Sequence, residues 1–220
     1  MNTGPTRLFV KLCGFVRPED VEAANALDLD ALGFVLADDA RVPLEPAQLE
    51  RLLDACDPRL TRVAVVGPKS REDCQRVLKL GFDAVQVVLT NWFSSTLDGK
   101  TVIPVLFDSP DVDELHSRLQ LVEPATEVGP HGRGLLCVDG PSGGGRGVRA
   151  DWARAERIAR RWPLLLAGGL RSDNVQTAIS SVRPRGVDVS SGVESEPGRK
   201  DHGKMAAFVD AVRASERALC

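Results

Sequence analysis

Short apolar runs recur along the chain and are separated by longer segments whose apolar positions repeat with a helical period. Eight runs have the character of buried strands, over residues 8–13, 31–36, 61–66, 84–88, 101–107, 134–138, 163–169 and 186–190. Amphipathic helices are predicted in most of the intervening segments, over residues 18–29, 45–56, 70–81, 150–162, 171–182 and 200–216. Strand and helix therefore alternate, which is typical of a parallel sheet.

The number and spacing of these units favour an α/β fold, a single-domain (β/α)₈ TIM barrel over residues 1–220. Successive strands begin roughly 20 to 30 residues apart, as in βα units. A doubly wound sheet also alternates strand and helix, but the GxGxxG fingerprint after an early strand is absent, and GGGRG at 143–147 falls late in the chain. Residues 91–100 have the least helical pattern, so we expect the fourth helix to be short or irregular.

Composition and charge narrow the class of protein. Hydrophobic residues make up 43% and charged residues 27% of the chain, which suits a globular protein with a large core. No run approaches the 18 apolar residues of a membrane span, and the N-terminus lacks the apolar core of a secretion signal, so we expect a cytoplasmic protein without a membrane partner. The net charge of −3 and the dispersed arginines argue against nucleic acid as a partner.

The cysteines and histidines do not predict a metal site. The five cysteines are scattered and form no CxxC pair, which is typical of reduced thiols, and the three histidines lack metal-ligand spacing.

Candidate chemistry gathers where the predicted strands end, because the loops at the C-terminal ends of barrel strands build the active site. The small residues of the last two loops allow a ligand to approach the backbone, whose N–H groups can hold a phosphate without a lysine, although tight turns alone would also explain them. The candidates at strand ends are Cys13, Arg41, Asp139, Gly168, Gly169, Ser190, Ser191 and Gly192.

Two of these residues have the chemistry of an acid and a base, but each also has a structural interpretation. Cys13 ends the run FVKLC, which Lys11 interrupts and Gly14 stops; it is either a small core residue or, if positive charge lowers its pKa, a thiolate base. Asp139 follows GLLCV, where apolar surroundings could raise its pKa and make it a proton donor; otherwise it is a turn or cap residue.

Five segments in order along the chain carry a resemblance to a known family. They are KLCG at 11–14, GFVLADDAR at 33–41, GGRGVRADW at 144–152, LAGGL at 166–170, and GVDVSSGVE with the following GRKD at 186–201. Together they resemble phosphoribosylanthranilate isomerase, a family of tryptophan biosynthesis. The matches extend from the first predicted strand to the last predicted helix, and so cover essentially the whole chain.

The resemblance implies a cofactor-free Amadori rearrangement of N-(5-phosphoribosyl)anthranilate to 1-(2-carboxyphenylamino)-1-deoxyribulose 5-phosphate. It implies that Cys13 is the general base, that Asp139 is the general acid, and that Arg41 pairs with the anthranilate carboxylate. The partner is then a small phosphorylated substrate, held at the last two loops, and the protein is a monomer or a homodimer. The resemblance adds three further substrate-binding residues, Lys11, Gln86 and Asp188.

The chain departs from the family pattern at two strand ends. Val88 and Leu89 replace a histidine and a glycine after the fourth strand, and Asp39 and Ala40 replace a serine and a proline before Arg41. We expect a more apolar pocket wall, retained chemistry and a broader tolerance of arylamines. Two alternatives remain at this level: an isomerase of another N-ribosyl arylamine phosphate, and a barrel that binds a phosphorylated ligand without turnover.

Overall fold

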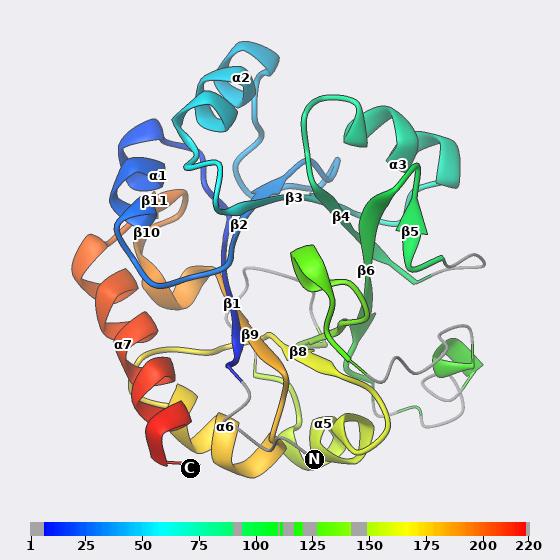
Figure 1. The fold of residues 1–220 in the computed structure, drawn as a ribbon, viewed down its shortest axis with the longest axis vertical. Coiled ribbons are helices and arrows are strands. Elements are labelled where there is room, and N and C mark those ends of the chain that lie inside the picture. Colours follow the sequence, from blue (N-terminus) through cyan, green and yellow to red (C-terminus); the bar gives the residue numbers. More distant parts are fainter. Residues whose placement is uncertain are drawn as a thin grey trace.

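The computed structural model describes residues 7–89, 94–109, 111, 117–120, 127–141 and 149–218, and Figure 1 shows its strands enclosed by helices. Over these residues, eight parallel strands pair in chain order, and pairings of β4 with β6 and of β1 with β9 close the ring. The barrel strands are β1 (Phe9–Cys13), β2 (Ala31–Val35), β3 (Thr61–Val66), β4 (Ala84–Val88), β6 (Lys100–Phe107), β7 (Leu136–Asp139), β8 (Leu164–Leu166) and β9 (Gly186–Val189). The predicted barrel and its strands are confirmed.

All six predicted helices are present, most of them shorter than the periodic segments that predicted them. Local signals explain their starts: Pro18 and Pro46 occupy first turns, Ser70 and Asp73 form a capping box, and Asp151 caps its helix. The helices are α1 (Pro18–Asn25), α2 (Pro46–Ala55), α3 (Arg71–Leu78), α5 (Trp152–Ala159), α6 (Val175–Val182) and α7 (His202–Ala218).

Two connections differ from a simple βα repeat. In the described part of the fourth connection, β5 (Thr96–Leu97) pairs antiparallel with β6, which confirms the expected irregularity. After β9, the short 3₁₀ turn η2 (Ser191–Val193) leads into a hairpin of β10 (Glu194–Glu196) and β11 (Arg199–Lys200), which the sequence did not predict. The glycine cluster at 143–147 lies outside the described residues.

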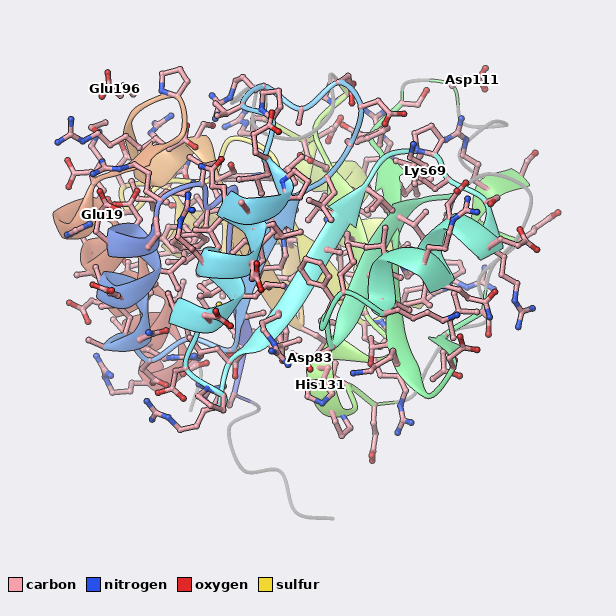
Figure 2. The ribbon with its side chains drawn as sticks, turned by 90° about the horizontal axis from the view of Figure 1, so that it is seen from above. Glu19, Lys69, Asp83, Asp111, His131 and Glu196 are labelled. Carbon is pink, nitrogen blue, oxygen red and sulfur yellow. The ribbon has the colours of Figure 1, made fainter. Side chains whose placement is uncertain are left out.

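The two ends of the barrel differ in character. Figure 2 shows Asp83 and His131 at the end where strands begin and Glu196 and Asp111 at the opposite end. At the first end, the turn η1 (Pro130–Gly132) packs close under the strands, and the Thr61 hydroxyl lies 3.1 Å from Nδ1 of His131. The loops that follow the strands therefore gather at the other end.

The barrel interior is apolar toward the end where the strands begin and polar toward the end where they finish. Side chains alternate along a strand, so Val10 and Leu12 of β1 pack toward the helices while Lys11 and Cys13 face the barrel axis. The apolar layer inside the barrel comprises Ile103, Val105, Leu135, Cys137, Leu165 and Ala167. This alternation explains why a lysine interrupts the apolar run of β1. In the described part of the chain, no helix has the length and apolar character needed to cross a membrane.

Candidate active site

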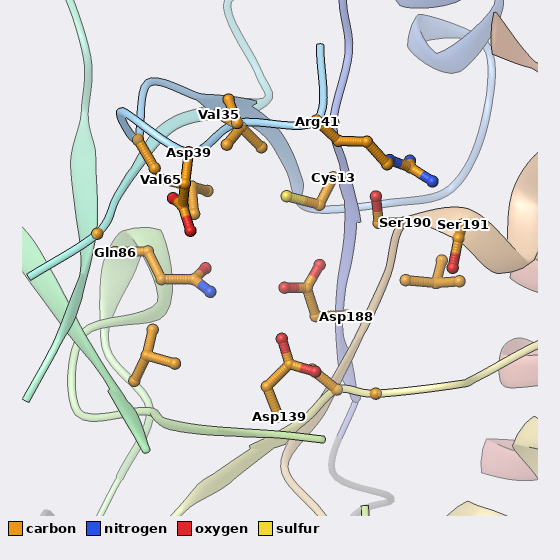
Figure 3. A pocket seen from close by; sticks show the side chains of 18 of the residues that line it. Cys13, Val35, Asp39, Arg41, Val65, Gln86, Asp139, Asp188, Ser190 and Ser191 are labelled. Carbon is orange, nitrogen blue, oxygen red and sulfur yellow. The ribbon is translucent and has the colours of Figure 1, made fainter. Parts of the chain in front are cut away.

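A cavity of about 410 Å³ opens at the C-terminal ends of the strands. Figure 3 shows Cys13, Gln86, Asp139 and Asp188 pointing into it from different strands. Apart from Lys11, the structure brings all the predicted site residues to its wall: Cys13, Arg41, Gln86, Asp139, Gly168, Gly169, Asp188, Ser190, Ser191 and Gly192. No group of three or more His, Cys, Asp or Glu side chains among the described residues is arranged to hold a metal ion.

Cys13 ends β1 with its side chain almost entirely enclosed, at 7% exposure. Burial raises the pKa of its thiol above the usual value, while the nearby ammonium groups of Lys11 and Lys200 act in the opposite direction. The positive potential that a thiolate needs is therefore present. The pKa of Cys13 is nevertheless not lowered, because desolvation outweighs the two charges. The prediction of a resting thiolate depended on a lowered pKa.

Asp139 ends β7 and matches the expectation of a raised pKa. Burial raises the pKa of its carboxyl to about 6, with a smaller contribution from the charge of Asp188, although Oδ1 accepts a 2.7 Å hydrogen bond from the Gly140 N–H. Gly168, at φ +84°, makes room for this carboxyl, because a Cβ there would lie 2.6 Å from Gly140 N and 3.1 Å from Asp139 Oδ1. A carboxyl with this pKa keeps part of its protonated form close to neutral pH.

Lys11 does not reach the cavity wall and instead forms a buried ion pair beneath it. Its Nζ lies 2.8 Å from Oδ2 of Asp188, and the lysine side chain has no exposed surface. Burial alone would lower the pKa of Lys11, but the charge of Asp188 and the neighbouring Cys13 raise it above its ordinary value. Lys11 is therefore a permanent cation in the barrel interior.

Two buried acceptor atoms at the cavity have no hydrogen-bond donor among the described residues. They are Oδ1 of Asp188 and Oε1 of Gln86. Because an unpaired buried oxygen costs free energy, such atoms at a cavity wall suit the hydroxyl or amine groups of a ligand.

Arg41 is held at the rim by a residue that the sequence analysis did not single out. Its Nη2 lies 2.6 Å from Oε2 of Glu194, whose other oxygen accepts from Lys200 Nζ at 3.0 Å. Lys200 also donates to the carbonyl oxygens of Cys13, at 2.5 Å, and Ser190, at 3.3 Å. The signal for this network was an acid and a base on either side of the Pro197–Gly198 turn, which indicates a charge-paired hairpin.

The loops after β8 and β9 meet backbone to backbone. A Cβ on Gly192 would lie 1.9 Å from the carbonyl oxygen of Leu170, so only glycine permits this approach. Ser190 and Ser191 complete a wall of small polar residues at this side of the cavity. Such a surface offers hydrogen-bond donors to an anion without a basic side chain.

The opposite wall is apolar and comes from β2, β3, β4 and β6. Its members are Val35, Val65, Val88, Val105 and Phe107. The expectation that Leu89 joins Val88 in this wall is wrong: Leu89 is 2% exposed and packs in the layer between strands and helices, because successive residues point to opposite sides. Asp39, in the loop after β2, also lines the cavity.

A closed parallel barrel whose C-terminal cavity contains the thiol of Cys13 and the carboxyl groups of Asp139 and Asp188 is typical of an enzyme that uses acid–base catalysis. The sequence profile of N-(5'-phosphoribosyl)anthranilate (PRA) isomerase matches residues 10–211. The chain belongs to the N-(5'-phosphoribosyl)anthranilate isomerase family.

Individual relatives agree along nearly their whole length. An N-(5'-phosphoribosyl)anthranilate isomerase from Roseiflexus sp. is 41% identical over 219 residues, which cover 94% of this chain and 98% of the relative. The crystal structure of TrpF from Jonesia denitrificans matches with a TM-score of 0.70 at 34% identity, over 94% of this chain and 98% of that one. A phosphoribosyl anthranilate isomerase in complex with reduced 1-(o-carboxyphenylamino)-1-deoxyribulose 5-phosphate matches with a TM-score of 0.74 at 26% identity, over 94% and 99%.

Proposed function

We propose that this protein is the isomerase of tryptophan biosynthesis that converts N-(5-phosphoribosyl)anthranilate to 1-(2-carboxyphenylamino)-1-deoxyribulose 5-phosphate. The observation that carries the proposal is the placement of a thiol, Cys13, and a carboxyl of raised pKa, Asp139, in one cavity on either side of Asp188 (Figure 3). Family membership and the relative crystallised with the reduced product analogue support the same assignment.

The two groups divide the proton transfers between them. Asp139 gives its proton to the ring oxygen of the ribofuranose, the C1–O bond breaks, and the nitrogen lone pair forms an iminium ion at C1. Cys13, as thiolate, takes the C2 proton, and the C–H electron pair forms the C1–C2 double bond of an enolamine while the iminium is neutralised. Tautomerisation of the enolamine gives the ketose, so the reaction needs no oxidant or reductant.

The rest of the cavity provides recognition. The guanidinium of Arg41 pairs with the anthranilate carboxylate, and the apolar wall around Val88 and Phe107 receives the aromatic ring. The unpaired oxygens of Asp188 and Gln86 accept hydrogen bonds from the sugar hydroxyls or the amine. The phosphate lies against the loops of Gly168, Gly169 and Ser190–Gly192, whose backbone N–H groups and hydroxyls donate to it.

Complementation of a tryptophan auxotroph that lacks this step tests the proposal. The wild-type gene should restore growth without tryptophan, and a Cys13→Ala/Asp139→Asn double variant expressed at the same level should not. If the wild type fails while the purified protein turns over another N-ribosyl arylamine phosphate, the substrate assignment is wrong. If it binds the substrate without turnover, the protein is a non-catalytic barrel.

Two further expectations belong with this proposal. A 26% identical crystal structure is of monomers generated from the dimeric phosphoribosylanthranilate isomerase of Thermotoga maritima; that the parent enzyme is dimeric supports the homodimer among the two states expected here. Sedimentation of the purified protein decides between monomer and homodimer. The cytoplasmic location, expected for an enzyme whose substrate arises in central biosynthesis, is tested by cell fractionation.

A further inference from the structure

The ammonium of Lys11 lies beside the sulfur of Cys13 inside the barrel. The two residues are two positions apart on β1, so both side chains face the axis. Across the sheet, Lys11 is in register with Asp188 of β9, and Cys13 is in register with Gly33 of β2. The strand pairing therefore brings one cation, one carboxylate and one thiol together.

Gly33 provides the space that the cation and the thiol share. A Cβ on Gly33 would lie 2.6 Å from Sγ of Cys13 and 2.9 Å from Nζ of Lys11, so both atoms converge on the position where any other residue would have its side chain. Lys11 is fully buried, and its Nζ donates to Oδ2 of Asp188 at 2.8 Å. In this dry surrounding, the charge of Lys11 acts on the thiol with little screening by solvent.

The charges that face Cys13 come from four elements. Lys11 on β1 and Lys200 on β11 favour the thiolate, Asp188 on β9 opposes it, and Cys137 and Asp139 lie across the barrel on β7. Lys200 donates to the carbonyl oxygen of Cys13, whereas the ammonium of Lys11 lies on the side of its sulfur, next to Gly33. Lys11 is thus the cation placed at the atom that would take the substrate proton.

We propose that Lys11 is a positioning residue rather than a substrate ligand: its ammonium stabilises the anionic sulfur of Cys13 for proton abstraction and, through its pair with Asp188, aims the free oxygen of that carboxylate at the substrate. This inference rests on the proposed role of Cys13 as the base. Lys11 remains an ammonium throughout and takes no part in proton transfer.

The alkylation rate of Cys13 by iodoacetamide measures this effect without substrate. The rate is followed at pH 9 in the folded protein by mass spectrometry of the peptide that contains Cys13. An opposite charge at close range shifts a pKa by roughly one to three units, so Lys11→Met should slow alkylation at least about ten-fold. Asp188→Asn should accelerate it. Lys204→Met is the control, because Lys204 is exposed and donates to the backbone of Glu194.

Opposite signs for the two variants distinguish electrostatics from loosened packing. Loosening would open the thiol to solvent and reagent in both variants and would move both rates in the same direction. Rates for Lys11→Met within two-fold of the wild type, or a slowing in Lys204→Met as large as that in Lys11→Met, would overturn the proposal.

A second comparison covers the case in which Lys11→Met does not fold, because it leaves Asp188 buried without a counter-charge. The Lys11→Met/Asp188→Asn double variant removes both charges and is compared with Asp188→Asn alone. The double variant should react about ten-fold more slowly at pH 9, and equal rates would refute the role of Lys11. Because the experiment measures alkylation and not turnover, the alkylation rates can be interpreted even if the isomerase assignment fails.

Discussion

Arg41 and Glu194 form an ion pair at the rim of the cavity, with Nη2 of the guanidinium 2.6 Å from Oε2 of the carboxylate. Glu194 is almost fully buried and is itself anchored by Lys200, whereas the Arg41 side chain is 41% exposed. The arginine is therefore held by a fixed partner on one side while its remaining N–H groups are available to a ligand.

Arg41→Ala should reduce kcat/KM for phosphoribosylanthranilate by an amount equivalent to roughly 1.5 to 3 kcal/mol, since the substrate carboxylate would lose its hydrogen-bonded cation at the rim of the cavity. The same change should matter little for an analogue without that carboxylate. Glu194→Gln should raise KM with a smaller effect on kcat, because Arg41 loses its anchor. Steady-state kinetics with both substrates measure this, and Glu196→Gln on the exposed side of the same hairpin is the control. Equal losses for both substrates in Arg41→Ala would contradict this assignment.

Cys13→Ala should lower turnover by at least about 100-fold while the barrel stays folded, because the reaction loses its base at the sugar C2. Cys74→Ala is the matched control: Cys74 lies on α3 and is fully buried in the core, so its loss should lower the melting temperature without a comparable loss of kcat. Circular dichroism and kcat are measured for both variants. Near-normal activity of Cys13→Ala would return this residue to a packing role.

The pH dependence of kcat/KM should reflect the titration of both Asp139 and Cys13. The pKa of Asp139 is about 6, while that of Cys13 is raised above 9.0, yet the reaction needs the carboxyl protonated and the thiol ionised. In that order of pKa values, only a small minority of molecules hold the single proton on Asp139 while Cys13 is ionised. The wild-type kcat/KM should still be level between the two pKa values, falling below pH 6 and above the pKa of the thiol.

Asp139→Asn should lower kcat with little change in KM, because the amide keeps the size of the side chain but cannot supply the proton. Its residual rate should depend on the thiolate alone and rise about ten-fold per pH unit from pH 7 to 9. A wild-type profile that climbs in the same way over this range would show that Asp139 is not the required acid.

Asp139→Asn should also stabilise the protein, and only at neutral or higher pH. The folded-state pKa of about 6 lies above the ordinary value of 3.8, so burying the carboxyl costs nothing below about pH 4 and its full cost is reached above pH 6. The difference corresponds to about 3 kcal/mol. Denaturant unfolding at pH 8 and pH 4 should show a gain for Asp139→Asn at pH 8 alone, with Asp54→Asn on exposed α2 as control. A gain of equal size at both pH values would rule out the titration.

Val88 should set the tolerance of the pocket for the aromatic ring. We expect the wild type to turn over the anthranilate substrate and to accept other arylamines as well, because its wall at β4 is apolar. Val88→His places a polar ring in that wall and should lower kcat/KM for the analogues relative to anthranilate several-fold. Leu89→Met, one residue away but in the outer layer, should leave this ratio unchanged. If the ratio of kcat/KM between the analogues and the anthranilate substrate is equal in all three proteins, Val88 does not contact the aromatic ring.

The sequence by itself determined the order of strands and helices, the barrel, and the strand ends at which Cys13 and Asp139 stand. These features depend on local periodicity, and a residue that ends a buried strand must lie at the mouth of the barrel. For Asp139, the sequence left open a raised pKa, suggested by the apolar run before it, and a turn or cap role; burial in the barrel decides for the raised pKa.

Tertiary structure decided what those residues face. The pairing of Lys11 with Asp188 joins the first and last strands and has no local signal. The residues around Pro197–Gly198 indicate a charge-paired hairpin, but they do not indicate that Glu194 of this hairpin pairs with Arg41 in a distant loop. The raised pKa of the Cys13 thiol could not be predicted from the sequence for the same reason. Desolvation and the charges of two lysines oppose each other there, and their balance depends on distances that only the closed barrel sets.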